Sequence, residues 1–263
     1  MAPGYEFINV TRNGAIATLL LNRPESLNAL NKGIMEEIEE ASRSFLDDEE
    51  TRVVVFRGSG KHFSAGADLK EMTDLYGTLA SLTEEQRIEG YRGNQPFSRN
   101  PKPFIAAVNG LAIGAGMERA TDCDIRIAST EAYFGLFEVK RGIMANYAIN
   151  NLARVLPYGE ASYLMLTGDT LSVEDAYRLG FVHEVLAPEE LMPRAIEIAE
   201  MIGANAPLAV QGTKAVAQFW RRYGLEESLQ FTATVGDRVL GSKDALEGPK
   251  AFSEKRPPVW RGE

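Results

Sequence analysis

Residues 62–70 read HFSAGADLK and residues 109–118 read NGLAIGAGME; we call these two glycine-containing stretches the first and the second loop. A short apolar run that predicts a buried strand precedes each loop, at residues 53–56 and 103–108. A predicted helix follows each loop, so that the free N–H groups of its first turn point back at the loop. Small residues also let a ligand approach the main chain. Two such junctions aimed at one point would form a pair of backbone donors, although glycines that only permit tight turns explain the same spacing.

A pair of backbone donors suits an oxygen atom that gains negative charge, such as a thioester carbonyl that becomes an enolate. Two glutamates lie where they could serve that chemistry: Glu118 at the start of the second helix, and Glu138 after the aromatic run at 133–137. In an apolar cavity two carboxylates have raised and unequal pKa values, so that one acts as a base and the other as an acid. The alternative is that both are surface residues or are paired with neighbouring basic side chains.

The N-terminal half alternates strand and helix signals around these loops. The dipeptide Asn13-Gly14 between the apolar runs 5–11 and 15–21 predicts a hairpin. Apolar residues three and four positions apart over 34–45, behind the N-cap candidate Asn31, predict an amphipathic helix. The further elements predicted in this half are a strand at 124–128 and helices at 68–76 and 83–97.

Beyond residue 157 the pattern becomes mainly helical. One strand is predicted, at 181–185, and the predicted helices cover residues 161–167, 173–179, 189–202, 208–223, 226–240 and 244–255. The fold class is therefore α/β. We expect an α/β core with the site at residues 1–200, and a helical region at residues 201–263 that packs on the core or on a neighbouring subunit.

The composition restricts the classes of function. The 28 basic and 37 acidic residues give a net charge of −9, which argues against a nucleic-acid binder. The single cysteine, Cys123, and the two histidines make a disulfide or a zinc site improbable, so no metal is expected. The longest apolar stretches are too short for a membrane span, and we predict a cytoplasmic protein without a membrane role.

Three nucleotide-binding or nucleophile motifs are incomplete in this sequence. The run GSGKH at 58–62 lacks the first glycine and the serine or threonine of a phosphate-binding loop. The second loop lacks the third glycine of a dinucleotide fingerprint, since position 119 is Arg119. Ser64 lacks the preceding glycine of a nucleophile elbow, because His62 occupies that place.

At these residues the chain resembles the crotonase superfamily, the enoyl-CoA hydratase/isomerase family. The matching segments run in the family's order along nearly the whole chain: LNRP at 21–24, LNAL at 27–30, FSAGADLK at 63–70, the stretch 103–118, CD at 123–124, FGxxE at 134–138, TG at 167–168 and EGPxAFxEKR at 247–256. The resemblance implies a crotonase-like spiral of strand-strand-helix repeats with a C-terminal helical trimerisation region. It also implies a homotrimer or a dimer of trimers.

The resemblance assigns roles position by position. The N–H groups of Ala67 and Ala115 would form the oxyanion hole for an acyl-CoA thioester, which is the implied partner. The coenzyme A part of the substrate would contact residues of the two loops and four residues outside them, two of these from a neighbouring subunit's tail: Ala65, Gly66, Asp68, Leu69, Lys70 and Gly114; Arg23 and Ala29; Phe252 and Lys255. No tightly bound cofactor is implied.

Glu118 and Glu138 fall on the two positions that hydratases of this family use. The implied reaction is syn addition of water to the 2,3 double bond of an enoyl-CoA. One glutamate would take a proton from water that attacks C3, and the other, Glu138 by our interpretation, would protonate C2. The alternatives that keep the same pocket are double-bond isomerisation, carnitinyl-type dehydration of a hydroxyacyl-CoA, and thioester hydrolysis. A non-catalytic acyl-CoA binding protein is the alternative of another class.

The stretch 143–152, IMANYAINNL, departs from the family pattern. Hydratases commonly have a proline- and glycine-rich turn here. Asn146 stands where a glycine N–H helps to hold the catalytic water, and we expect Tyr147 and Ile149 to add bulk near the acyl pocket. Arg119 occupies a position where a small or apolar residue is commoner. These departures bear on the acyl specificity and on the choice between the reactions.

Overall fold

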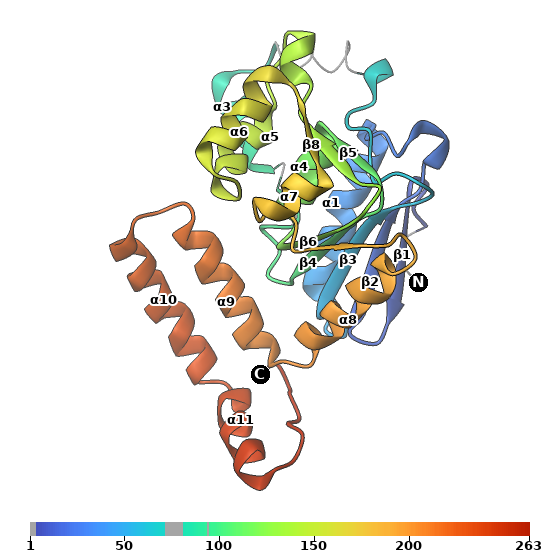
Figure 1. The fold of residues 1–263 in the computed structure, drawn as a ribbon. Coiled ribbons are helices and arrows are strands. Elements are labelled where there is room, and N and C mark those ends of the chain that lie inside the picture. The colour runs from blue at the N-terminus through green and yellow to red at the C-terminus, as the bar shows by residue number, and fades with distance from the viewer. Residues whose placement is uncertain (1–3, 72–80, 94) are drawn as a thin grey trace.

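A six-stranded sheet forms the centre of the molecule in the computed structural model, which describes residues 4–71, 81–93 and 95–263 (Figure 1). Its strand order is β1-β2-β3-β4-β6-β9; β1 pairs antiparallel with β2, and the other neighbours pair in parallel. The strands are β1 (Ile8–Asn13), β2 (Ile16–Leu21), β3 (Val53–Gly58), β4 (Phe104–Val108), β6 (Ile125–Ser129) and β9 (Glu184–Leu186). The hairpin at Asn13-Gly14 is confirmed, and Gly14 has the left-handed φ of 55° that its turn requires.

A second, three-stranded sheet includes residues of the second loop. It has the order β5-β7-β8, from β5 (Leu111–Ile113), β7 (Tyr133–Gly135) and β8 (Thr170–Ser172). Since β5 follows β4 and α4 (Ala115–Asp122) follows β5, this part of the chain is a strand-strand-helix unit. The pattern analysis missed all three strands, because three residues are too few to show an alternating pattern.

The core lies on both faces of the large sheet. Val53 and Val55 of β3 pack with α8 (Leu191–Gly203), whereas Val54 and Phe56 belong to the larger cluster with α1 (Lys32–Asp47). This double burial explains why the sequence shows a continuous apolar run at β3 instead of an alternation. The helix predicted behind Asn31 is confirmed as α1, and the Asn31 side chain accepts a hydrogen bond from Ile34 N at 2.8 Å.

The predicted α/β core followed by helices is confirmed. The other helices are α3 (Glu84–Gly93), α5 (Asn146–Asn151), α6 (Tyr158–Thr167), α7 (Val173–Arg178), α9 (Pro207–Trp220), α10 (Leu225–Leu240) and α11 (Lys243–Glu254), with short 3₁₀ turns η1 (Pro24–Ser26), η2 (Glu138–Arg141) and η3 (Leu152–Arg154). The helix predicted at 68–76 falls mainly on residues 72–80, which lie outside the described residues.

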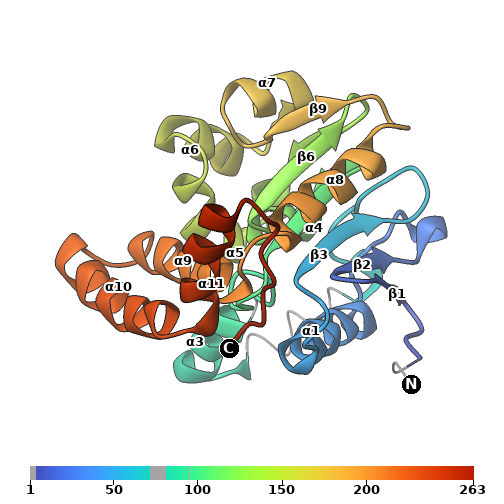
Figure 2. The same ribbon diagram turned by 90° about the horizontal axis from the view of Figure 1, so that it is seen from below.

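Residues 207–263, which we call the C-terminal arm, extend away from the sheets as α9, α10 and α11 (Figures 1 and 2). Buried Lys214 of α9 joins the arm to the core: its Nζ lies 2.8 Å from Asp124 Oδ2 and donates to the carbonyls of Phe97 and Lys102. Large apolar side chains remain exposed along the arm, among them Trp220, Leu240, Leu246 and Phe252.

Neither a membrane span nor a metal cluster occurs in the described part of the chain. No helix there is long and apolar enough to cross a bilayer. The same residues contain no group of three or more histidine, cysteine, aspartate or glutamate side chains placed to hold a metal ion.

Candidate active site

The first and second loops pack directly against each other. Ser64 N donates to Leu111 O and Ile113 N donates to Ser64 O, both at 3.0 Å. Gly66 has a φ of 90°, and a Cβ atom there would lie 2.6 Å from Ile113 O and 3.3 Å from Ala115 N. The structure therefore brings the two predicted strand–loop–helix junctions to one place, and the contact is too close for a side chain at residue 66.

The two amides assigned to an oxyanion hole belong to the adjoining parts of these loops. Leu30 N donates to Gly66 O and Asp68 N donates to Leu30 O, so the N–H of Ala67, which lies between them in extended backbone, points away from Leu30. Ala115 is the first residue of α4, where N–H groups have no acceptor within the helix.

Glu138 lies against the second loop. Gly114 N donates to Gly135 O of β7 at 2.8 Å, so the start of η2, which follows β7, lies next to this loop. A Cβ atom on Gly114, whose φ is 53°, would come within 2.9 Å of Glu138 Oε1. The other oxygen, Oε2, is buried and has no hydrogen-bond partner among the described residues. Burial raises the pKa of Glu138, and the nearby charge of Glu118 raises it further.

Glu118 is buried near the start of α4, and two backbone amides of α5 donate hydrogen bonds to its carboxylate. Its Oε1 accepts hydrogen bonds from Tyr147 N at 3.1 Å and Ala148 N at 3.0 Å. Burial raises the pKa of Glu118, while the two amides and the Arg119 charge act in the opposite direction. The two carboxylates thus interact but have different surroundings, because one has two amide donors and the other has a buried oxygen without any.

Several residues expected to contact coenzyme A lie together beside the first loop. Arg23 Nη1 donates to Ala29 O at 3.0 Å and to Asp68 Oδ2 at 3.1 Å, and Lys70 N donates to Asp68 Oδ1. The side chains of Leu69 and Lys70 are exposed. The main chain reinforces this arrangement, because Ala65 N donates to Leu27 O and the segment around Ala29 runs alongside the loop.

Phe252 and Lys255 do not join this group within one chain. They lie at the end of α11, on the far end of the arm from the two loops (Figure 1). The Phe252 side chain is 87% exposed. Any contact of these two residues with coenzyme A therefore requires the arm of another subunit.

The structure changes the interpretation of Tyr147, and it shows a residue that sequence reasoning missed. The Tyr147 ring is buried, and its hydroxyl donates to Asp122 Oδ1 at 3.1 Å. Ile149, by contrast, is exposed. Asp122 was not a candidate, although an aspartate one turn after Glu118 on a helix with an apolar surface is a signal that could have identified it.

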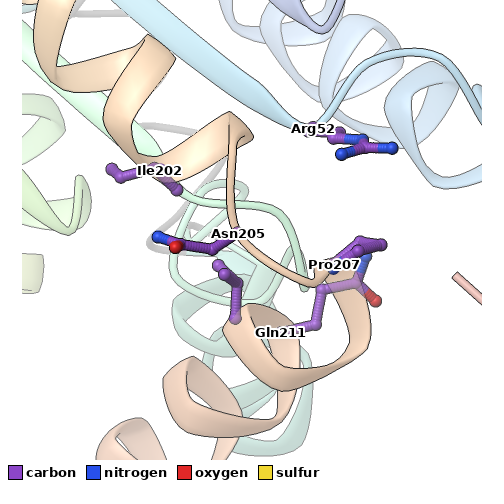
Figure 3. Close-up of a pocket in the computed structure, with 6 residues that line it drawn as sticks. Arg52, Ile202, Asn205, Pro207 and Gln211 are labelled. Atoms are coloured by element: carbon purple, nitrogen blue, oxygen red, sulfur yellow. The ribbon is translucent and has the colours of Figure 1, made fainter. Parts of the chain in front are cut away.

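A small surface pocket lies apart from these groups, where α8 meets α9 (Figure 3). The residues that line it are Arg52, Ile202, Asn205, Pro207, Val210 and Gln211. Its charged group is already in use, since Arg52 Nη1 donates to Gly203 O at 3.0 Å. The residues that line this pocket include no acid–base pair.

The chain is similar to known proteins over nearly its whole length. Residues 11–263 match the family model described as enoyl-CoA hydratase/isomerase. The chain is 37% identical over 250 residues to the short-chain-enoyl-CoA hydratase of Clostridium acetobutylicum, and the alignment covers 93% of this chain and 94% of that protein. It is 37% identical over 263 residues to the carnitinyl-CoA dehydratase of Salmonella arizonae, with 98% and 99% covered.

The fold agrees with these sequence matches. The crystal structure of the enoyl-CoA hydratase from Bacillus anthracis superposes on this chain with a TM-score of 0.88 at 34% identity. The superposition covers 98% of this chain and 100% of that one. The predicted α/β crotonase-like fold with C-terminal helices is therefore confirmed, and the structure shows that it contains two sheets.

Proposed function

The chain belongs to the enoyl-CoA hydratase/isomerase (crotonase) family, whose members act on acyl-CoA thioesters, and on this premise we propose that it is an enoyl-CoA hydratase. The reaction is syn addition of water to the 2,3 double bond of an enoyl-CoA. The observation that carries the proposal is that the carboxylates of buried Glu118 and partly buried Glu138 interact with each other beside the loop that begins α4.

The two glutamates differ in the way that the reaction requires. Glu118 is the base: the amides of Tyr147 and Ala148 favour its carboxylate form, which takes a proton from the water that attacks C3. Glu138 is the acid: its buried, unbonded oxygen and raised pKa favour the protonated form, which delivers a proton to C2.

The N–H groups of Ala67 and Ala115 stabilise the enolate oxygen that forms on the thioester between these two proton transfers. Coenzyme A lies along the first loop, where Ala65, Gly66, Leu69 and Lys70 offer main-chain and side-chain contacts. The exposed Lys70 adds positive charge for the phosphates of coenzyme A, against the net charge of −9 of the whole chain, and Arg23, which is paired with Asp68, lies beside it. No further cofactor takes part.

The second candidate is the dehydration of a carnitinyl-type hydroxyacyl-CoA. The match to a carnitinyl-CoA dehydratase is as close in identity as the match to the hydratase. The stretch 143–152 differs from the turn expected of hydratases. The same two glutamates serve both reactions, since dehydration is the reverse of hydration.

Substrate assays distinguish the two candidates. Purified protein is mixed with crotonyl-CoA and longer enoyl-CoA thioesters, and the absorbance of the conjugated thioester is followed. We expect absorbance to fall and the product mass to rise by one water. An unchanged mass with a moved double bond indicates isomerisation, and turnover of a carnitinyl-type thioester alone supports the dehydratase. Binding without turnover across the whole panel contradicts both and supports a binding protein.

We also propose that the protein assembles as a homotrimer or a dimer of trimers through the C-terminal arm. The exposed apolar side chains of the arm offer the area for subunit contacts, and such contacts would bring Phe252 and Lys255 to a neighbouring first loop. Sedimentation equilibrium should give three or six times the chain mass of 28.9 kDa. A monomer at all concentrations contradicts this assembly.

A further inference from the structure

Helix α4 carries charged side chains into the interior beside the candidate site. Every residue from Gly116 to Asp122 is buried, and Arg119 and Asp122 are each 1% exposed. Buried charges are costly unless they are paired. Arg119 Nη1 lies 3.9 Å from Asp122 Oδ2, and the amides of Phe97 and Ser98 donate to the same carboxylate. Asp122 is therefore firmly held in one position.

Tyr147 of α5 binds to this pair through its side chain. Its hydroxyl donates to Asp122 Oδ1 at 3.1 Å, and the Arg119 guanidinium carbon lies 5.7 Å from the centre of its ring. The ring is only 6% exposed. Three buried side chains thus form one cluster, which we call the Tyr147 cluster: Arg119, Asp122 and Tyr147.

The main chain of the same tyrosine binds the candidate base. Tyr147 N and Ala148 N donate to Glu118 Oε1, whereas the Tyr147 hydroxyl binds Asp122, four residues further along α4. Residues four apart share one face of a helix. Tyr147 therefore spans one turn of α4, and its hydroxyl fixes the distance between α4 and the amides that hold the Glu118 carboxylate.

We propose that Tyr147 is a positioning residue for Glu118, which it orients through a hydroxyl bond to Asp122 and ring contact with Arg119. This inference rests on the proposed function, in which Glu118 is the base. It also accounts for Arg119 and Asp122 on a helix whose other interior residues, apart from Glu118, are small or apolar. This role explains the departure from the family pattern at residue 147, because the tyrosine side chain helps to hold Glu118 in position.

Charged groups face Glu118 or Tyr147 from several elements. On α4 they are Arg119 and Asp122, and η2 supplies Glu138 with Arg141 beside it. Arg126 of β6 and Arg221, at the end of α9, interact with Tyr147. The substitution Tyr147→Phe leaves all these charges in place and removes one hydroxyl. A change in the pKa of Glu118 in this variant therefore reports that the two amide donors have moved relative to its carboxylate.

The test compares Tyr147→Phe with Tyr163→Phe in steady-state kinetics. Tyr163 is the matched control, because its hydroxyl also donates to an aspartate, Asp169, but on the exposed surface of α6. We expect Tyr147→Phe to lower kcat about tenfold with little change in KM, and to move the acidic limb of the kcat profile to higher pH. Tyr163→Phe should match the wild type. Wild-type kcat and pH profile in Tyr147→Phe would overturn the inference.

A double variant separates positioning from general loss of structure. Because the tyrosine is proposed to act through Glu118, Tyr147→Phe should change the residual kcat of Glu118→Gln by less than about twofold. An equal loss in both backgrounds contradicts the inference.

An infrared titration keeps the inference distinct from the proposed function. In protein with ¹³C-labelled glutamate, the protonated carboxyl band that is absent from Glu118→Gln belongs to Glu118. That band should persist to higher pH in Tyr147→Phe than in the wild type, and an unchanged titration contradicts positioning. If the wild type hydrates no enoyl-CoA, the proposed function fails, but this titration still decides whether Tyr147 acts on Glu118.

Discussion

Glu118 and Glu138 differ because different parts of the chain reach them. Two backbone amides of α5 donate hydrogen bonds to Glu118. One oxygen of Glu138 lies close to Gly114, and its other oxygen is buried without a hydrogen-bond donor among the described residues. Burial raises the pKa of both groups, and the charge of Glu118 raises the pKa of Glu138 further. A base and an acid can therefore arise from two residues of the same type.

Replacing either glutamate by glutamine should abolish most activity without weakening the fold. For Glu118→Gln and Glu138→Gln we expect kcat to fall by about 10²–10⁴-fold, the contribution typical of a general acid or base. The affinity for an unreactive acyl-CoA analogue, measured by calorimetry, should change little. A variant that retains more than a tenth of the wild-type kcat contradicts its assignment.

The stability of these variants follows from the direction of the pKa shifts. A carboxyl whose pKa is raised on folding favours the folded state at low pH, and this stability is lost as pH rises through the folded pKa. At pH 7 the charged forms therefore disfavour folding, and a neutral glutamine removes that cost. Urea denaturation at pH 7 should give each variant a midpoint equal to or above that of the wild type.

The same shifts predict the pH dependence of catalysis. Hydration needs Glu118 ionised and Glu138 protonated, so kcat/KM should rise as the base loses its proton and fall as the acid loses its own. Both limbs should lie above the ordinary glutamate range because both pKa values are raised. Since the groups interact, the two apparent values belong to the pair. Initial rates with an enoyl-CoA from pH 4 to 9 measure the profile, and a single limb at an ordinary glutamate pKa contradicts the coupling.

At the scale of elements, the two loops depend on each other. β4 and β5 place the second loop against the first, and the contact leaves no space for a Cβ atom at Gly66. The strands of the large sheet, the amphipathic helix α1 and most C-terminal helices follow from local patterns, and these were predicted. The small sheet was not, since its short strands are defined by their partners and not by their own residues.

Gly66→Ala tests the loop contact. A left-handed φ costs a non-glycine residue about 1–2 kcal/mol, and at Gly66 the new methyl group also meets Ile113 O at 2.6 Å. Gly180→Ala is the control, because Gly180 has a φ of 74° but nothing within 4 Å of its Cβ position. We expect a greater loss of unfolding free energy in Gly66→Ala, together with a lower kcat. Equal stabilities and activities of the two variants contradict the tight contact.

At the scale of the whole molecule, one buried lysine joins the C-terminal arm to the core. Lys214 Nζ makes an ion pair with Asp124 and two hydrogen bonds to carbonyls near the start of β4, and Arg222 Nη2, just after α9, donates to Gln95 Oε1 at 2.8 Å. Large apolar side chains of the arm, such as Leu240 and Leu246, are exposed, and the proposed assembly would bury them.

Lys214→Met should therefore destabilise the protein strongly. Removing one member of a buried ion pair typically costs about 3 kcal/mol or more, and the Asp124 side chain that would lose its partner is only 19% exposed. Lys243→Met is the matched control: Lys243 Nζ lies 2.8 Å from Glu263 Oε1, but both side chains are exposed, and little change is expected. Urea denaturation measures both variants, and similar stability of the two indicates that Lys214 contributes no more than a surface pair.

The family and the α/β core followed by helices could be predicted from the sequence alone, and the same motifs identified Glu118 and Glu138 as candidates, because each of these depends on contiguous residues or on local periodicity. The tertiary structure decided which groups hold the glutamates. A hydrogen bond from Tyr147 N to Glu118 spans 29 residues and uses the main chain, so it cannot be predicted from the residue types. The same holds for Asp122 and Lys214: a charged side chain can be stably buried only where the folded chain brings its partners to it.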